Sequence, residues 1–88
     1  MALIDELAEE LARDCMKAMD EMGDDRFYEK VARTIGELSP TLQEAFNTAM
    51  RLNIAARRGR SFLDRSLAAH RGQGEAPVAP RAVDTGGH

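Results

Sequence analysis

Few of the residues that can carry out chemistry stand at the spacings that catalysis or metal binding requires. Cys15 is the only cysteine among the 88 residues, so an internal disulfide is excluded. It lies on the apolar stripe of a predicted helix, which favours a small buried side chain over a nucleophile, because a reactive thiolate needs an accessible, electropositive setting. His70 and His88 have no cysteine, histidine or carboxylate neighbours at ligand spacing.

The carboxylates and glycines give no further sign of catalysis. Glu9 and Glu10 are neighbours on a predicted solvent face, without a cleft that could raise a pKa, and they do not resemble a catalytic acid–base pair. The chain also has no glycine-rich phosphate-binding motif. We therefore expect no enzymatic step, no catalytic residue, no cofactor and no metal.

Charge is distributed very unevenly along the chain. Residues 1–30, here called the acidic segment, hold ten acids against four bases. Residues 51–71, the arginine-rich segment, hold six arginines against one acid, while the net charge of the whole chain is only −3. A polarity of this kind favours binding over catalysis.

Three arginines are seven residues apart on one predicted helix and form an arginine column: Arg51, Arg58 and Arg65. Successive members are about 10.5 Å apart along the helix axis, from a rise of about 1.5 Å per residue. Such a column suits phosphates or an acidic partner helix, although arginines late in a helix also complement its dipole. The predicted partner-binding residues are Arg51, Arg57, Arg58, Arg65, Glu6, Glu9 and Asp20.

The acidic segment is only partly explained by the helix dipole. Acids in the first turns of a helix are favoured by the dipole, whereas Asp20 and Glu21 stand near the other end, where it disfavours them. The remaining explanation is a basic partner, or the arginine column of a second copy of the chain.

Apolar residues at alternating steps of four and three predict a first helix at about residues 3–22. This stripe has the spacing of a coiled-coil seam and consists of Ile4, Ala8, Leu11, Cys15, Ala18 and Met22. Gly23 ends the helix, because glycine readily adopts the left-handed conformation of a C-cap. Since only about 70 residues are available for a core, the stripe also predicts a weak homodimer.

A second helix is predicted at residues 25–38, with Asp24 or Asp25 as its N-cap. Ser39 is the expected N-cap of a third helix, and Pro40 suits its first position, where the missing N–H costs nothing. This joint is too short for a DNA-binding helix-turn-helix, whose turn has three or four residues.

The third helix is predicted at residues 40–71, with an inner stripe of Leu42, Ala45, Phe46, Ala49, Leu52 and Ala56. Gly59 either ends it, leaving a fourth helix at 62–71, or is tolerated within one helix at about 1 kcal/mol relative to alanine. The continuous helix is favoured, because a break would leave only a short final piece. The fold class is therefore all-α: a domain at 1–71 of three or four helices with a long third helix, followed by a disordered tail at 72–88.

The composition also bears on location and source. The first residues lack the basic flank and long apolar run of a signal peptide or membrane span, and a single unpaired cysteine fits a reducing compartment. We therefore expect a cytoplasmic protein without membrane contact. Ten arginines against two lysines, with abundant alanine, point to a GC-rich bacterial genome.

Together these features predict a small non-enzymatic interaction or regulatory module. It would act through helix-face contacts with an acidic protein surface, or with itself as a homo-oligomer. The alternative is an accessory nucleic-acid-binding protein that uses the arginine column. Aromatic residues that would stack on single strands are missing from the arginine-rich segment apart from Phe62, which weakens this alternative.

We expect the tail to be disordered, because residues 72–88 have too little apolar surface to offset the entropy of ordering. Backbone NMR order parameters at Val78, Ala79 and Ala82 should be far below those of the helices. Rigid values at these three positions would contradict the prediction.

Overall fold

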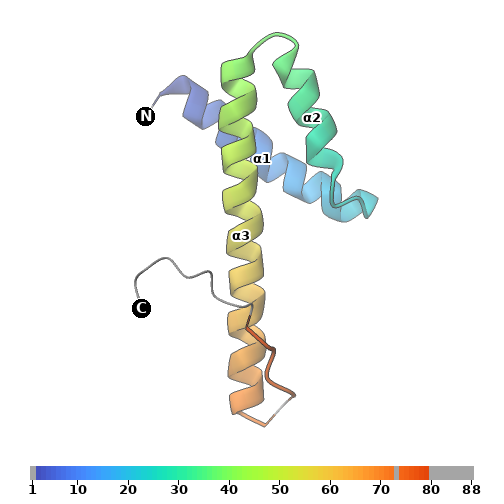
Figure 1. Cartoon of the computed structure of the whole chain (residues 1–88), viewed down its shortest axis with the longest axis vertical. Helices are drawn as coiled ribbons and strands as arrows, with labels where there is room; N and C mark the ends of the chain where they lie inside the picture. The colour runs from blue at the N-terminus through green and yellow to red at the C-terminus, as the bar shows by residue number, and fades with distance from the viewer. Residues whose placement is uncertain (1, 73, 80–88) are drawn as a thin grey trace. The chain divides into compact units, whose positions relative to one another are not determined.

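The computed structural model describes residues 2–72 and 74–79. It contains three helices, α1 (Leu3–Met22), α2 (Phe27–Gly36) and α3 (Pro40–His70), and no strand among the described residues (Figure 1). The predicted all-α class and the long third helix are confirmed.

The chain divides into two compact units, Met1–Ala56 and Arg57–His88, and α3 is one helix that belongs to both. It passes Gly59 without a break, so the alternative with a fourth helix is wrong. Glycine inside a helix costs about 1 kcal/mol relative to alanine, and the good helix formers on either side of Gly59 outweigh this cost. Residues 74–79 lie in neither helix nor strand, and the rest of the predicted tail after Gly72 lies outside the described residues.

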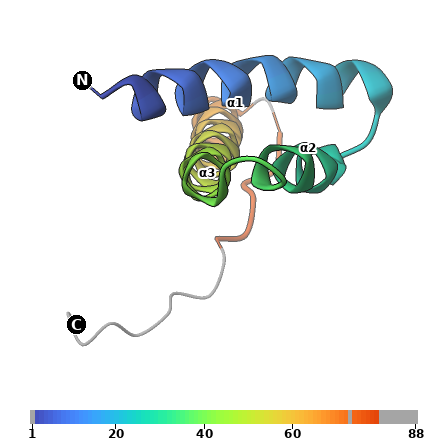
Figure 2. The same cartoon turned by 90° about the horizontal axis from the view of Figure 1, so that it is seen from above.

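All three helices contribute to the core of the first unit. Figure 2 shows α1 lying across α2 and the first part of α3. Phe46 and Met50 of α3 are fully buried at 0% exposure. Around them lie Ala12, Cys15, Met16, Met19, Ala32 and Ala49, with further packing from Leu11, Phe27, Tyr28, Val31, Ile35 and Ile54.

The buried face of α1 is rotated relative to the predicted stripe. Met22, a member of that stripe, is 55% exposed, and Leu3 and Leu7, which were expected to widen it, are exposed as well. Met19, also expected to widen it, is buried, and so is Met16, which the prediction left out. Apolar residues cover a wide arc of α1, so their spacing alone does not select which edge packs inward. The small side chain of Ala12 leaves room in the core for the bulky side chain of Phe46.

The predicted inner stripe of α3 is also only partly correct. Phe46 and Ala49 are buried, but Leu52 is 66% exposed and Ala56 is exposed as well. Met50 takes a core position that the stripe did not include. The inner face of α3 therefore lies to one side of the predicted one.

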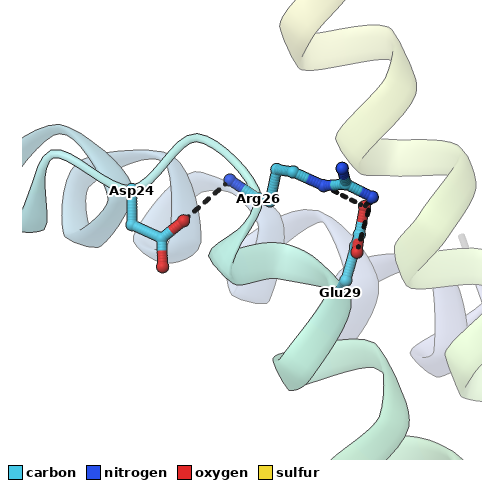
Figure 3. A network of polar contacts seen from close by, with 3 residues as sticks. All are labelled: Asp24, Arg26 and Glu29. Carbon is cyan, nitrogen blue, oxygen red and sulfur yellow. Dashed lines mark hydrogen bonds and ion pairs between the residues drawn. The ribbon is translucent and has the colours of Figure 1, made fainter.

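A hydrogen-bonded turn precedes α2 and shortens it relative to the predicted 25–38 (Figure 3). The Asp24 carboxylate accepts a hydrogen bond from the backbone N–H of Arg26 at 3.0 Å, so it stabilises the turn, and Arg26 holds the N-cap position instead of Asp24 or Asp25. The Arg26 guanidinium then pairs with the Glu29 carboxylate at 3.0 Å. This hydrogen bond raises the pKa of Arg26.

The joint between α2 and α3 is longer than the sequence predicts, because α2 ends at Gly36 and residues 37–39 precede α3. The expectation that this joint is too short for a three-residue turn is therefore wrong. Backbone N–H groups of Leu38 and Ser39 both donate to the carbonyl oxygen of Ile35, which closes α2. The Ser39 hydroxyl accepts a hydrogen bond from the backbone N–H of Leu42 at 3.0 Å, which is the expected N-cap of α3. Pro40 follows as the first residue of that helix.

At the end of α1, Gly23 has φ +68° and its N–H donates to the carbonyl oxygen of Met19 at 2.9 Å. This left-handed backbone conformation ends α1 and directs the chain into the turn before α2, as predicted.

The core position of Phe46 leads to a stability prediction. Phe46→Ala should lower the free energy of unfolding by about 3–5 kcal/mol, because it leaves a cavity where all three helices meet. Leu38→Ala is the control, since Leu38 is 96% exposed, and should change it by less than about 0.5 kcal/mol. Urea unfolding followed by circular dichroism measures both, and equal losses would contradict this description of the core.

Candidate functional site

The arginine column lies on the exposed surface of α3. Arg51, Arg58 and Arg65 are all exposed on α3. Arg58 and Arg65 lie in the second unit and, at seven-residue spacing, share one face of the helix, whereas Arg51 belongs to the first unit. The Nε of Arg65 donates to the carbonyl oxygen of Ser61 at 3.4 Å, which aligns that side chain along the helix. Arg57 is exposed too, but it points about 100° around the helix from Arg58.

The predicted acids lie on α1 in the first unit. Glu6, Glu9 and Asp20 are exposed, and Glu6 and Glu9 are three residues apart and therefore neighbours on the helix surface. The last turn of α1 contains no basic residue. The structure thus brings Glu6 and Glu9 together on one surface, as the sequence suggests, while Arg57, Arg58 and Arg65 belong to the second unit.

An open groove of about 360 Å³ lies between α1 and α3 in the first unit. It is lined by Asp5, Ala8, Glu9, Ala45, Thr48, Ala49, Leu52 and Asn53. The α1 side carries two exposed carboxylates, Asp5 and Glu9, and the α3 side carries the exposed Leu52. Small residues line its bottom, where Ala8 is 2% and Ala49 is 7% exposed. The groove therefore combines an apolar base with an acidic wall.

The groove could not be predicted from the apolar stripe of α3 alone. The missing information was the position of α1, which places Ala8 beside Ala45 and Ala49. Asn53 is the one amide in the lining, and its Nδ2 donates to the carbonyl oxygen of Ala49 at 2.8 Å. This hydrogen bond ties the amide to its own helix.

The second unit exposes two large apolar side chains on α3. Leu63 is 52% and Leu67 is 42% exposed. Arginines are frequent around them, and Arg60 makes only a long ion pair with Asp64, at 3.9 Å between two well-exposed side chains. Such an exposed pair contributes little to stability. The leucines and arginines together form an amphipathic helical surface of positive charge.

Cys15 is buried, as predicted, at 5% exposure. Its thiol lies 3.7 Å from the sulfur of Met19 within the core of the first unit. Burial raises the pKa of the Cys15 thiol above its ordinary value of 9.0, because the apolar surroundings disfavour the thiolate. The cysteine therefore has the character of a packing residue.

Within residues 2–72 and 74–79, histidine, cysteine, aspartate and glutamate side chains form no group able to hold a metal ion. None of the helices that the structure describes is long and apolar enough to cross a membrane. No family model, no curated protein and no solved structure matches the chain. The exposed surfaces of the helices are therefore the features of this chain that bear on function.

The raised pKa of Cys15 predicts a pH dependence of stability. The unfolded thiol ionises near its ordinary pKa of 9.0, while the folded thiol stays neutral to higher pH. The stability linked to Cys15 is therefore fully present below about pH 9 and is lost as pH rises through the folded pKa.

Urea unfolding of the wild type and of Cys15→Ala at pH 7, 8, 9 and 10 measures this difference. Relative to Cys15→Ala, the wild type should lose stability at the highest pH. The thiol should also react with a disulfide reagent at least about tenfold faster in denaturant than in the native state. An equal rate in the two states would show that Cys15 is accessible.

Proposed function

We propose that this chain is a small non-enzymatic interaction module that binds a protein partner through its exposed helix faces. The observation that carries the proposal is the surface of α3, which exposes the arginine column on one side of the helix and Leu52, Leu63 and Leu67 on other sides. Arginine is enriched at protein interfaces because its guanidinium group pairs with carboxylates, and exposed apolar side chains gain by leaving water.

An acidic protein surface suits the column better than nucleic acid does. The chain as a whole carries a net charge of −3, and α1 exposes acids along its length. These negative charges repel phosphate and weaken non-specific binding to a nucleic acid, which depends on net positive charge. The column also lacks neighbouring aromatic residues on which bases could stack.

The absence of an enzymatic step is part of the proposal. Among the described residues no polar or charged side chain is buried, whereas a catalytic group normally requires a partly buried setting that shifts its pKa. The groove contains two carboxylates, one threonine and one asparagine but no nucleophile with an adjacent base.

The test is a triple reversal of the column, Arg51→Glu, Arg58→Glu and Arg65→Glu. We expect it to abolish capture of an acidic protein from a lysate of the source organism, with helical content nearly unchanged because the three positions are exposed. The matched control reverses three other exposed cations, Arg13, Lys17 and Arg33, and should retain the captured protein. Quantitative mass spectrometry of the captured proteins measures both.

A parallel titration with duplex DNA tests the nucleic-acid alternative. Three phosphate contacts would give a log–log salt slope of about −2.7 on B-DNA. We expect little binding at about 150 mM salt. Submicromolar, salt-sensitive binding that the column reversal abolishes would overturn the proposal in favour of a nucleic-acid-binding function, and equal protein capture by wild type and reversal would refute the role of the column.

A further inference from the structure

The open groove between α1 and α3 belongs entirely to the first unit, because its lining residues all fall between positions 5 and 53. Its accessible lining combines polar and apolar groups. Asp5, Glu9 and Thr48 are exposed, and Leu52 is 66% exposed. Ala45 is small and only half-buried, so the lining leaves space that a side chain of another molecule can fill.

Leu52 gives the groove an apolar rim and has no role in the core. The core cluster of the first unit includes Ala49 and Met50 of the same helix but not Leu52. A large apolar side chain that stands in water gains free energy when another apolar group covers it. The groove therefore favours a ligand with at least one apolar side chain.

The charge around the groove is negative. Neither Asp5 nor Glu9 forms an ion pair with another described residue. The described residues of the lining include no lysine or arginine. Residues 1–56 as a whole hold twelve acids against six bases, a formal charge of −6. The two carboxylates can therefore pair with cations of a ligand, whereas an anionic ligand is repelled.

We propose that this groove binds a basic amphipathic helix of another protein. An apolar side chain of that helix covers Leu52 and fills the space above Ala45, in the manner of helices that dock into grooves. Asp5 and Glu9 are four residues apart, which is about 6 Å along α1. Lysines or arginines four residues apart on a helix that runs along α1 have the same spacing, so each cation pairs with one carboxylate.

This site differs from the arginine column in both residues and preference. The groove takes a basic partner and the column takes an acidic one. Its described lining contains none of the three arginines of the column. The two sites therefore bind different partners, and either can fail without the other.

A patterned peptide is the probe for the groove. It has about 16 residues of alanine, leucine and lysine, with leucines along one face of the helix and lysines four residues apart beside them. Titrated into the isotope-labelled full chain, it should shift the amide NMR signals of Ala45, Thr48, Leu52 and Asn53. A peptide of the same composition in shuffled order is the control, and its dissociation constant should be at least about fivefold higher.

Amide substitutions test the carboxylates. Asp5→Asn with Glu9→Gln should raise the dissociation constant of the patterned peptide at least about fivefold. Glu10→Gln with Glu21→Gln is the matched control, because it removes the same charge from exposed positions of α1 outside the groove lining. It should change the constant less than about twofold. Circular dichroism checks that each variant keeps its helices.

Leu52→Ala tests the apolar rim and should raise the same constant at least about threefold. Leu38→Ala is its control, since Leu38 is 96% exposed and lies outside the groove lining, and should leave the constant unchanged.

Equal binding of the two peptides would overturn the groove site, as would equal effects of the two amide pairs or shifts confined to residues outside the lining. Groove signals that shift as the full chain alone is concentrated would assign the groove to a second copy and overturn the choice of another protein. If the peptide binds as described while the column reversal changes no capture, the groove stands and the proposed function fails.

Discussion

The structure depends on burying Phe46 and Met50 of α3 beneath α1 and α2. These two side chains are fully buried, and the other members of the core are alanines, methionines and one cysteine. A core of this size gives only a small stabilisation, because a short chain buries a modest share of its apolar surface. The three-residue joint at 37–39, which ends in the Ser39 cap, makes this burial possible by joining α2 directly to the start of α3.

The same constraint explains why so much apolar surface stays outside the core. Two short helices can cover only part of a helix of 31 residues, so Leu52, Leu63 and Leu67 remain exposed. In the first unit, α1 leaves an open groove beside α3, with small residues at its bottom and carboxylates on one wall. Function is therefore to be sought on the helix surfaces, since the core consists of apolar side chains and Cys15 packs as one of them.

The exposed surfaces divide into faces of different chemistry. The arginine column presents guanidinium groups about two helical turns apart, and charge of this kind mainly guides the choice of partner and the rate of encounter. The exposed leucines of α3 offer apolar contact, which supplies affinity when water is excluded.

The sequence by itself determined the helical class, the long third helix, the ends of α1 and the Ser39 cap, because apolar spacing and capping residues act over a few neighbouring positions. It also placed Cys15 inside and the predicted arginines outside. Only the tertiary structure decided which edge of α1 and α3 packs inward, since both helices are apolar over a wide arc. That choice buried Met50, exposed Leu52 and formed the groove beside Asp5 and Glu9. Local spacing specifies a helix. Which faces of two helices pack together depends on how side chains far apart in the sequence fill the shared core volume.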